Sequence, residues 1–400
     1  MVEEAKKCMK CGFCMSVCPI YLLDHIESHV ARGRNMLINL RERLSKAPSY
    51  KEALYFCILC GRCQHICPSG LPNVNITIAA RNELVKKEGL GIIQRFVYHM
   101  LLNRRTLLAN IVRLISYIPG ISRNGAPSLR HLADSFFIFT HIVSIPDFSK
   151  PFLRERIPLS KQKGKIAFFP GCAFEFLFAN TGEKLFYFLK EKLGLDIEYP
   201  TGIGCCGFPV YCAGDIETAK KIAKRNIEVL SGYERIITGC ATCVSGLRSY
   251  INMFEGEDKK KAERVSSAVM GISEFIVKEK FDLKLSCSSL SVTYHDPCHM
   301  RWHQGIFDEP RKIISSIRGV EFIEMKDSDM CCGLGGAFGI THRKESLELQ
   351  KRKIESIIKT NAQLIVTECP GCMIQIKDGI AKRNLPIKVM HLGELLYYSS

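Results

Sequence analysis

The sequence predicts a multidomain α+β protein, with an all-α N-terminal domain followed by a tandem pair of related α/β domains. Two observations predict this order: a pair of closely spaced cysteine runs near the start, and a longer five-cysteine pattern that occurs twice after residue 164. A third is composition, because 46% hydrophobic residues in a chain of 400 can bury a large core. We expect domain boundaries at 1–90, 91–163, 164–287 and 288–400.

The N-terminal domain contains two runs with the same spacing, C-x2-C-x2-C-x3-C-P. Their cysteines are Cys8, Cys11, Cys14 and Cys18 in the first run and Cys57, Cys60, Cys63 and Cys67 in the second. Residues 31–44 have apolar side chains at helical spacing. Residues 76–87 predict a second helix, which ends before Gly89.

These runs favour two cubane [4Fe–4S] clusters. Each close spacing lets one loop supply three thiolates, and the fourth ligand then comes from the last cysteine of the other run. The predicted ligand sets are Cys8, Cys11, Cys14 and Cys67 for one cluster and Cys57, Cys60, Cys63 and Cys18 for the other. The alternative is structural zinc, which prefers paired C-x2-C knuckles and fits these runs less well.

The segment 91–163 is apolar and basic, with six arginines and no carboxylate between Glu88 and Asp134. Apolar residues from Leu101 to Leu114 predict one or two amphipathic helices, and residues 148–165 predict a linker. Three roles stay open for the helices: binding an anionic membrane surface, docking a partner subunit, or covering the cluster domain.

The remainder is an internal repeat of strands and helices. Residues 165–169 and 291–294 predict the first strand of each copy, and residues 235–238 and 364–367 predict a later one. Helices are expected between them, at 215–230 and 344–359. This alternation predicts α/β units around a mainly parallel sheet.

Each copy contains one lone cysteine, one Cys-Cys-Gly and one C-x2-C pair. The ligand candidates are Cys172, Cys205, Cys206, Cys240 and Cys243 in the first repeat and Cys298, Cys331, Cys332, Cys369 and Cys372 in the second. Five thiolates exceed the four that one zinc ion takes, so we expect one or two further iron–sulfur clusters here. A structural metal knuckle is the alternative.

Other polar and sulfur side chains lie outside these patterns. Cys212 and Cys287 are expected to be buried free thiols. His295, Asp296, His299 and His303 surround Cys298 and either shuttle protons or form ordinary hydrogen bonds.

Residues 202–207 match the letters of the dinucleotide fingerprint G-x-G-x-x-G, but the cysteine pair fills its variable positions and no strand is expected before it. We therefore expect no flavin or nicotinamide on this chain.

The formal charge of +16 counts every thiol as neutral. Four oxidised clusters of roughly −2 each would reduce it to about +8, which argues against nucleic acid as a partner. The alternative of a basic nucleic-acid-binding or scaffold protein predicts zinc and no iron. No uncharged apolar run is long enough to span a membrane, and the N-terminus has no apolar signal region. We expect a cytoplasmic protein, peripheral to the inner face of the membrane if it is membrane-associated.

The two runs and the two five-cysteine repeats together resemble the iron–sulfur subunits of glycolate oxidase and lactate dehydrogenase. They are also similar to the D-type subunit of heterodisulfide reductase. The strings HVARGR (29–34), CPSGLP (67–72), YHDPC (294–298) and CPGCM (369–373) favour the hydroxyacid-oxidising group.

The first resemblance implies a ferredoxin-like N-terminal domain and an electron-transfer subunit. A partner flavoprotein would oxidise glycolate or lactate, and this chain would pass the electrons toward a membrane quinone, a cytochrome or another acceptor. The second resemblance implies a catalytic thiol–disulfide reductase with a noncubane [4Fe–4S] cluster. The complete set of five cysteines in both repeats keeps that alternative open.

Overall fold

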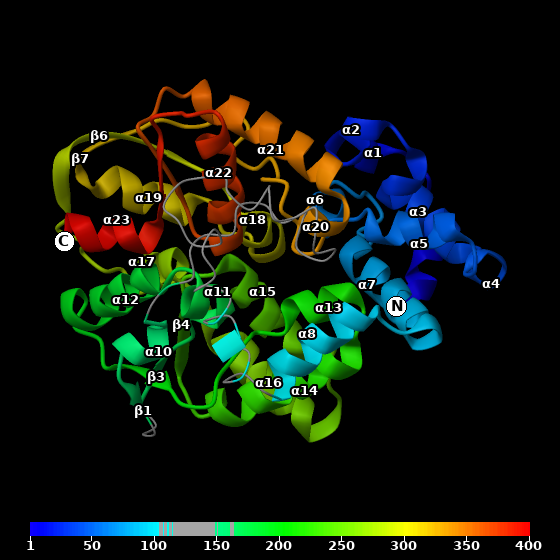
Figure 1. Ribbon diagram of the computed structural model, residues 1–400, viewed down its shortest axis with the longest axis horizontal. Helices are drawn as coiled ribbons and strands as arrows, with labels where there is room; N and C mark the ends of the chain where they lie inside the picture. Colours follow the sequence, from blue (N-terminus) through cyan, green and yellow to red (C-terminus); the bar gives the residue numbers. More distant parts are fainter. Residues whose placement is uncertain (104–106, 108–109, 112–113, 115–148, 150, 161–163) are drawn as a thin grey trace.

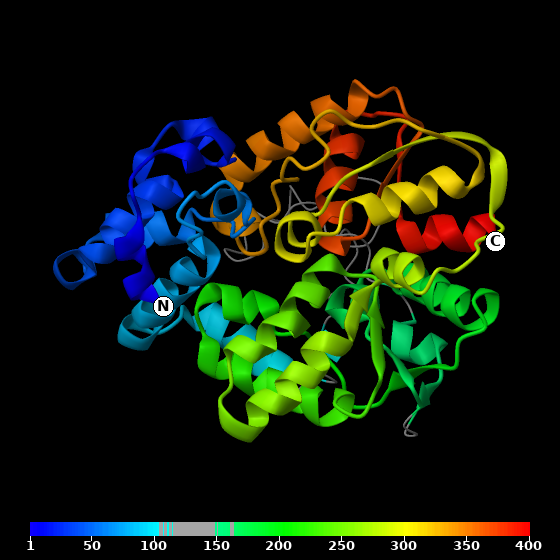
Figure 2. The ribbon, with the colours of Figure 1, turned by 180° about the vertical axis from the view of Figure 1, so that it is seen from behind.

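The computed structural model describes residues 1–103, 107, 110–111, 114, 149, 151–160 and 164–400. Its N-terminal helices lie at one end of the molecule, beside two α/β halves that are stacked on each other (Figure 1). The view from behind in Figure 2 shows the same arrangement. The domain boundaries given above stay predictions.

The described secondary-structure elements of the N-terminal domain are all helices. Its elements are η1 (Val2–Lys7), α1 (Phe13–Val17), α2 (Tyr21–Asp24), η2 (Glu27–His29), α3 (Ala31–Asn39), α4 (Arg41–Leu44), α5 (Pro48–Tyr55), α6 (Arg62–His65) and α7 (Asn73–Glu88). The single helix expected at 31–44 is two helices, because Leu40 leaves helical geometry at φ −96° and ψ 11°. Helix α7 begins three residues before the expected start.

The segment 91–163 is partly described. Helix α8 (Ile92–Asn103) packs on α14 of the first α/β half, a contact that does not decide among the three roles left open for this stretch. The expected helical residues after Asn103 fall mostly outside the described residues.

The expected linker is not wholly irregular, because it contains α10 (Leu153–Arg156) and β1 (Leu159–Ser160). Strand β1 pairs with β3 and forms the sheet edge.

The first half is a parallel five-stranded sheet in the order β1-β3-β2-β4-β5. Its strands after β1 are β2 (Ile166–Phe168), β3 (Ile197–Pro200), β4 (Arg235–Thr238) and β5 (Val269–Gly271). Its helical elements are α11 (Gly171–Phe176), α12 (Ala179–Tyr187), η4 (Phe188–Lys192), α13 (Phe208–Ala213), α14 (Ile216–Leu230), α15 (Ala241–Arg248), η5 (Ser249–Asn252), α16 (Gly256–Ala268) and α17 (Ile272–Lys278).

The second half is a parallel four-stranded sheet in the order β7-β6-β8-β9. Its strands are β6 (Ser286–Tyr294), β7 (Arg318–Phe322), β8 (Leu364–Thr367) and β9 (Lys388–His391). Its helices are α18 (Cys298–Gln304), α19 (Asp308–Ser316), α20 (Phe338–Thr341), α21 (Arg343–Ile358), α22 (Pro370–Lys382) and α23 (Leu392–Ser399). This order matches β3-β2-β4-β5, so the internal repeat is a repeat of structure.

The last helix of each half packs on a helix of the other half. Helix α17, which follows the first sheet, packs on α19 of the second half. Helix α23, which follows the second sheet, packs on α12 of the first half. The largest apolar core accordingly contains buried residues of both halves. Among the described residues, no helix is both long and apolar enough to cross a membrane.

Candidate functional site

The N-terminal cysteines line two separate pockets. One pocket is lined by Cys8, Cys11, Cys14 and Cys67. The other is lined by Cys57, Cys60, Cys63 and Cys18. These are the two sets that the cysteine spacing predicts, each with three cysteines of one run and the last cysteine of the other. Asn73 lines both pockets and donates to the backbone oxygen of Cys63 at 3.4 Å, so the two pockets are neighbours.

A glycine shapes each cysteine run in the same way. Gly12 follows Cys11 and Gly61 follows Cys60, and both adopt a left-handed backbone, with φ of 87° and 85°. Each glycine is the N-cap of a short helix, α1 or α6, that carries the third cysteine of its run. The left-handed residue folds the first three cysteines of a run around one pocket.

The second pocket suits an anionic metal cluster. Burial raises the pKa of the Cys60 thiol to about 12, and burial also raises the pKa of Cys63 well above its usual value. Several thiolates therefore need bound cations to form here. Arg34 also lines this pocket and is buried, and its Nε has no hydrogen-bond partner among the described residues. The thiols and the guanidinium together fit an iron–sulfur cluster.

The repeat cysteines gather at the carboxyl ends of the parallel strands. Cys172 follows β2 and Cys240 follows β4, and these strands are adjacent. Cys298 and Cys369 follow β6 and β8 in the same way. In the first sheet, β3 lies on the outer side of β2 and β5 lies on the outer side of β4, and β7 and β9 flank β6 and β8 in the same way. The strand order therefore reverses between the two central strands, and the cysteines lie at this topological switch point.

Helix N-termini and turn amides provide donors around both repeat sites. Cys243 and Cys372 lie in the first turns of α15 and α22, where the helix dipole favours negative charge. The Gly207 amide donates to the Cys205 sulfur at 3.4 Å, and the Gly333 amide donates to the Cys331 sulfur at 3.3 Å. Each repeat can therefore stabilise thiolates bound to a metal.

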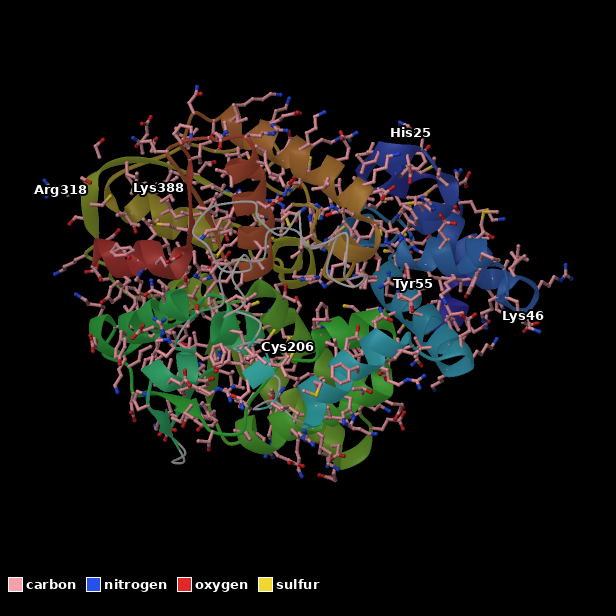
Figure 3. The ribbon with its side chains drawn as sticks, viewed as in Figure 1. His25, Lys46, Tyr55, Cys206, Arg318 and Lys388 are labelled. Atoms are coloured by element: carbon pink, nitrogen blue, oxygen red, sulfur yellow. The ribbon has the colours of Figure 1, made fainter. Side chains whose placement is uncertain are left out.

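The two repeat sites are neighbours. The Thr242 hydroxyl lies 3.8 Å from the Cys369 sulfur, and the Ala241 amide donates to the Glu368 carbonyl at 3.0 Å. Figure 3 labels Cys206 close to the boundary between the two halves.

The second repeat also adjoins the N-terminal domain. Cys60 and Cys331 belong to one apolar cluster, against which Cys18 and Cys298 pack. Burial raises the pKa of Cys298, and the nearby Cys60 raises it further. The four cysteine sites therefore form a row. It runs from the site of the first repeat, through the site of the second repeat, to the N-terminal pocket that contains Cys60 and then to the N-terminal pocket that contains Cys11.

Buried donors hold the N-terminal domain on the first half. Arg81 donates to the carbonyls of Leu54 and of Cys212, the latter at 2.7 Å. Tyr55, labelled in Figure 3, donates to the Ala213 carbonyl at 3.1 Å. Sequence reasoning missed Arg34, Asn73 and Arg81, because nothing in a single sequence marks a polar helical residue as buried.

The polar groups near Cys298 have different surroundings. His299 pairs with the Thr242 hydroxyl at 3.0 Å, and His303 pairs with the Leu59 carbonyl at 3.0 Å. Asp296 forms ion pairs with Arg301 and Arg311. His299, His303 and Asp296 therefore form ordinary hydrogen bonds or ion pairs, which was one of the two roles that the sequence left open for them. Neither ring nitrogen of His295 has a nitrogen or oxygen partner among the described residues, and the ring interacts with the Cys332 sulfur.

Two expectations need correction. Cys212 and Cys287 are free but half-buried rather than fully buried, because each lies at the rim of the core. The fingerprint at 202–207 does follow a strand, since β3 ends at Pro200. That strand was missed because its short sequence, IEYP, combines a proline and a carboxylate. The loop nevertheless carries Cys205 and Cys206, both buried.

Comparisons with known proteins agree with this architecture. A family described as a 4Fe-4S dicluster domain matches residues 4–71, and a cysteine-rich domain family matches residues 166–248 and 292–377. The chain is 30% identical to a subunit of the CoM/CoB fumarate reductase of Methanothermobacter marburgensis, over 98% of this chain and 72% of that protein.

It is also 30% identical to the probable glycolate oxidase iron-sulfur subunit of Bacillus subtilis, over 98% of this chain and 93% of that protein. Lactate utilization protein A of the same organism is 30% identical over 58% of this chain and 98% of its own length.

The dicluster domain and the paired cysteine-rich domains define an iron–sulfur protein that serves as a subunit of an oxidoreductase. Within that class, the chain belongs to the family that includes the glycolate oxidase iron–sulfur subunit and lactate utilization protein A.

Proposed function

We propose that the chain is the electron-transfer subunit of a flavin-linked 2-hydroxyacid dehydrogenase acting on glycolate or lactate. A partner flavoprotein oxidises the hydroxyacid, and this chain passes the electrons toward a quinone or another acceptor. Iron–sulfur clusters, when bound, accept and release single electrons. The chain supplies their ligands and sets their spacing.

The proposed ligands are the eighteen patterned cysteines. The two cubane clusters take Cys8, Cys11, Cys14 and Cys67, and Cys57, Cys60, Cys63 and Cys18. The further centres take Cys172, Cys205, Cys206, Cys240 and Cys243, and Cys298, Cys331, Cys332, Cys369 and Cys372. The buried thiols and the donors around them support this assignment.

One observation supports electron transfer above others, namely that the four cysteine sites adjoin each other in a row. The row reaches the surface at its N-terminal end. Cys11 is exposed there, and the neighbouring Met9 and Phe13 are 64% and 56% exposed. An electron can therefore enter or leave at a surface that also offers apolar side chains to a partner.

The proposal is tested by isolating the tagged chain from its native cells without oxygen. We expect a flavoprotein to co-purify, and we expect glycolate or lactate to bleach the visible iron–sulfur absorbance of the complex. Cys60→Ser serves as the matched variant, because it removes one ligand from the middle of the row. Bleaching should then stop short of full reduction. A preparation with full iron, a bound flavoprotein and no response to any 2-hydroxyacid would contradict the proposal.

A second candidate is a catalytic thiol–disulfide reductase. Two observations support this candidate. Each half brings its complete five-cysteine set to the carboxyl ends of its strands. One relative is named as part of a CoM/CoB fumarate reductase. In this reaction two electrons and two protons convert one disulfide into two thiols. A reduced viologen dye supplies the electrons in the test. Dye oxidation that depends on an added heterodisulfide would support this candidate, and its absence in iron-loaded protein would eliminate it.

A further inference from the structure

His295 lies at the end of strand β6, directly beside the cysteines of the second repeat. Its backbone amide donates to the Val366 carbonyl at 2.9 Å, which fixes it against β8. The residue is 1% exposed, and neither ring nitrogen has a nitrogen or oxygen atom of the described residues as a hydrogen-bond partner. Buried polar nitrogens are rarely left without a partner, and the group that interacts with this imidazole is the sulfur of Cys332.

Two cysteine sulfurs converge with this imidazole. The sulfurs of Cys332 and Cys372 lie 3.4 Å apart. One ring nitrogen of His295 and these two sulfurs all lie within 4.8 Å of one another. Metal bonds of about 2.0 Å to nitrogen and 2.3 Å to sulfur place two donors of one tetrahedral ion about 3.6 Å apart. One metal ion can therefore reach all three atoms after small side-chain shifts.

Among the described residues of the first repeat, no histidine nitrogen lies at the matching position. Phe169 occupies the equivalent position, and its amide donates to the Ile237 carbonyl at 2.8 Å, just as the His295 amide does to Val366. Phe169 is fully buried in the core. The two backbones are thus equivalent at this point, and only the side chain differs.

We propose that His295 binds iron through a ring nitrogen, together with Cys332 and Cys372. The second-repeat centre then has mixed nitrogen and sulfur ligands, whereas the first-repeat centre has sulfur ligands alone. This inference shares one assumption with the proposed function, namely that the repeat sites hold iron–sulfur centres.

Two further facts agree with this role. His295 is buried away from solvent, and a neutral imidazole is the form that binds metals. Replacing thiolate by imidazole as an iron ligand raises the reduction potential of a cluster. The second-repeat centre should therefore be the stronger electron acceptor of the two.

The test is pulsed EPR of the full iron-loaded chain, prepared without oxygen and with ¹⁵N-labelled histidine. Each centre is made paramagnetic in turn by redox poising. We expect one centre of the native protein to show the strong hyperfine coupling of a directly bound nitrogen. This first measurement needs no variant, so it does not depend on any variant folding.

Three variants sharpen the result. His295→Phe copies the first repeat and should abolish the coupling. His303→Gln alters a half-buried histidine outside the proposed ligand set and should leave the coupling unchanged. His295→Cys keeps a metal ligand but adds negative charge, so it should retain the iron, lose the coupling and lower the midpoint potential of that centre.

The outcomes separate this inference from the proposed function. Full iron content with no nitrogen coupling, or only the weak coupling of a hydrogen-bonded imidazole, would overturn the ligand role alone. A coupling that persists in His295→Phe would do the same. A chain that takes up no iron at all would overturn the proposed function as well.

Discussion

The two α/β halves share one sheet order and one cysteine pattern, but they surround their cysteines differently. Phe169 stands in the first half where His295 stands in the second. Asn226 of α14 corresponds to Lys353 of α21. Asn226 hydrogen-bonds the Gly204 amide and the Cys205 carbonyl.

Lys353 donates to the carbonyls of Asp327 and Ser328, at 2.5 and 3.2 Å. Both side chains therefore hydrogen-bond the loop at the cysteine pair. Asn226 does so with a neutral amide, and Lys353 does so with a cationic ammonium group. The comparison shows that a repeat can keep its geometry while it changes the charge around a metal site. The second half has the cation and the imidazole, and the first half has neither at these positions.

The largest expected difference between the halves concerns a pair of equivalent glycines. A β-carbon on Gly333, at φ 96°, would overlap the backbone oxygen of Ser346. A β-carbon on Gly207, at φ 75°, would lie 3.1 Å from a methyl group of Ile222. We expect Gly333→Ala to cost about 3 kcal/mol in the free energy of unfolding and Gly207→Ala about 1–2 kcal/mol, since a side chain yields more easily than backbone.

Denaturant unfolding of the iron-loaded variants measures both changes. Equal losses, or a larger loss for Gly207→Ala, would show that the two Cys-Cys-Gly turns are not built as the structure describes.

The next prediction concerns the charge on α21. Lys353 lies near Cys331 and Cys332, and burial lowers its pKa to about 8. Lys353→Met removes a cation that stabilises the reduced centre, so the midpoint potential of the second-repeat centre should fall by about 60 mV, a tenfold change in a one-electron equilibrium. In the native protein the same potential should fall as pH rises through about 8, because Lys353 loses its proton.

Asn226→Met is the matched change in the first half. It removes hydrogen bonds but no charge, so it should lower stability and leave the potential of the first-repeat centre nearly unchanged. Potentiometric titration across the pH range measures both effects. A potential that does not respond to Lys353→Met would show that the charge difference between the halves has no redox consequence.

The smallest effect concerns the free thiols. Burial raises the pKa of Cys212 to about 12, whereas Cys287 lies between exposed residues at the start of β6. Alkylation of Cys212 in iron-loaded protein should be at least roughly tenfold slower than that of Cys287 at neutral pH, because the thiolate is the reactive form. The Cys212 rate should rise as pH increases from 9.0 toward about 12. Mass spectrometry of each peptide gives the rates, and faster modification of Cys212 would contradict the raised pKa of its thiol.

The sequence predicted those features that depend on short spacing. Each C-x2-C-x2-C run folds around one pocket, and the fourth cysteine crosses over from the other run as expected. The strands at 235–238 and 364–367 were predicted at their observed bounds, because the central residues of each are apolar and β-branched. The assignment of the cysteines as ligands stays a prediction.

Other features depend on tertiary contacts that a single sequence does not show. Strands β3 and β7 are short and carry charged residues, so alternation did not reveal them. Lys353 lies on a helix rich in lysine and glutamate, where a lysine usually faces solvent. The equivalence of Lys353 to Asn226 emerges only when both helices are seen against their Cys-Cys-Gly turns.

The central claim is that the two halves hold chemically different metal centres. A redox titration of the ⁵⁷Fe-loaded native protein, followed by Mössbauer spectroscopy, tests it most directly. The account predicts two repeat centres that titrate separately, with the one assigned to the second half by Lys353→Met at the higher potential. Repeat centres that titrate together with identical spectra, or repeats that contain no iron, would contradict it.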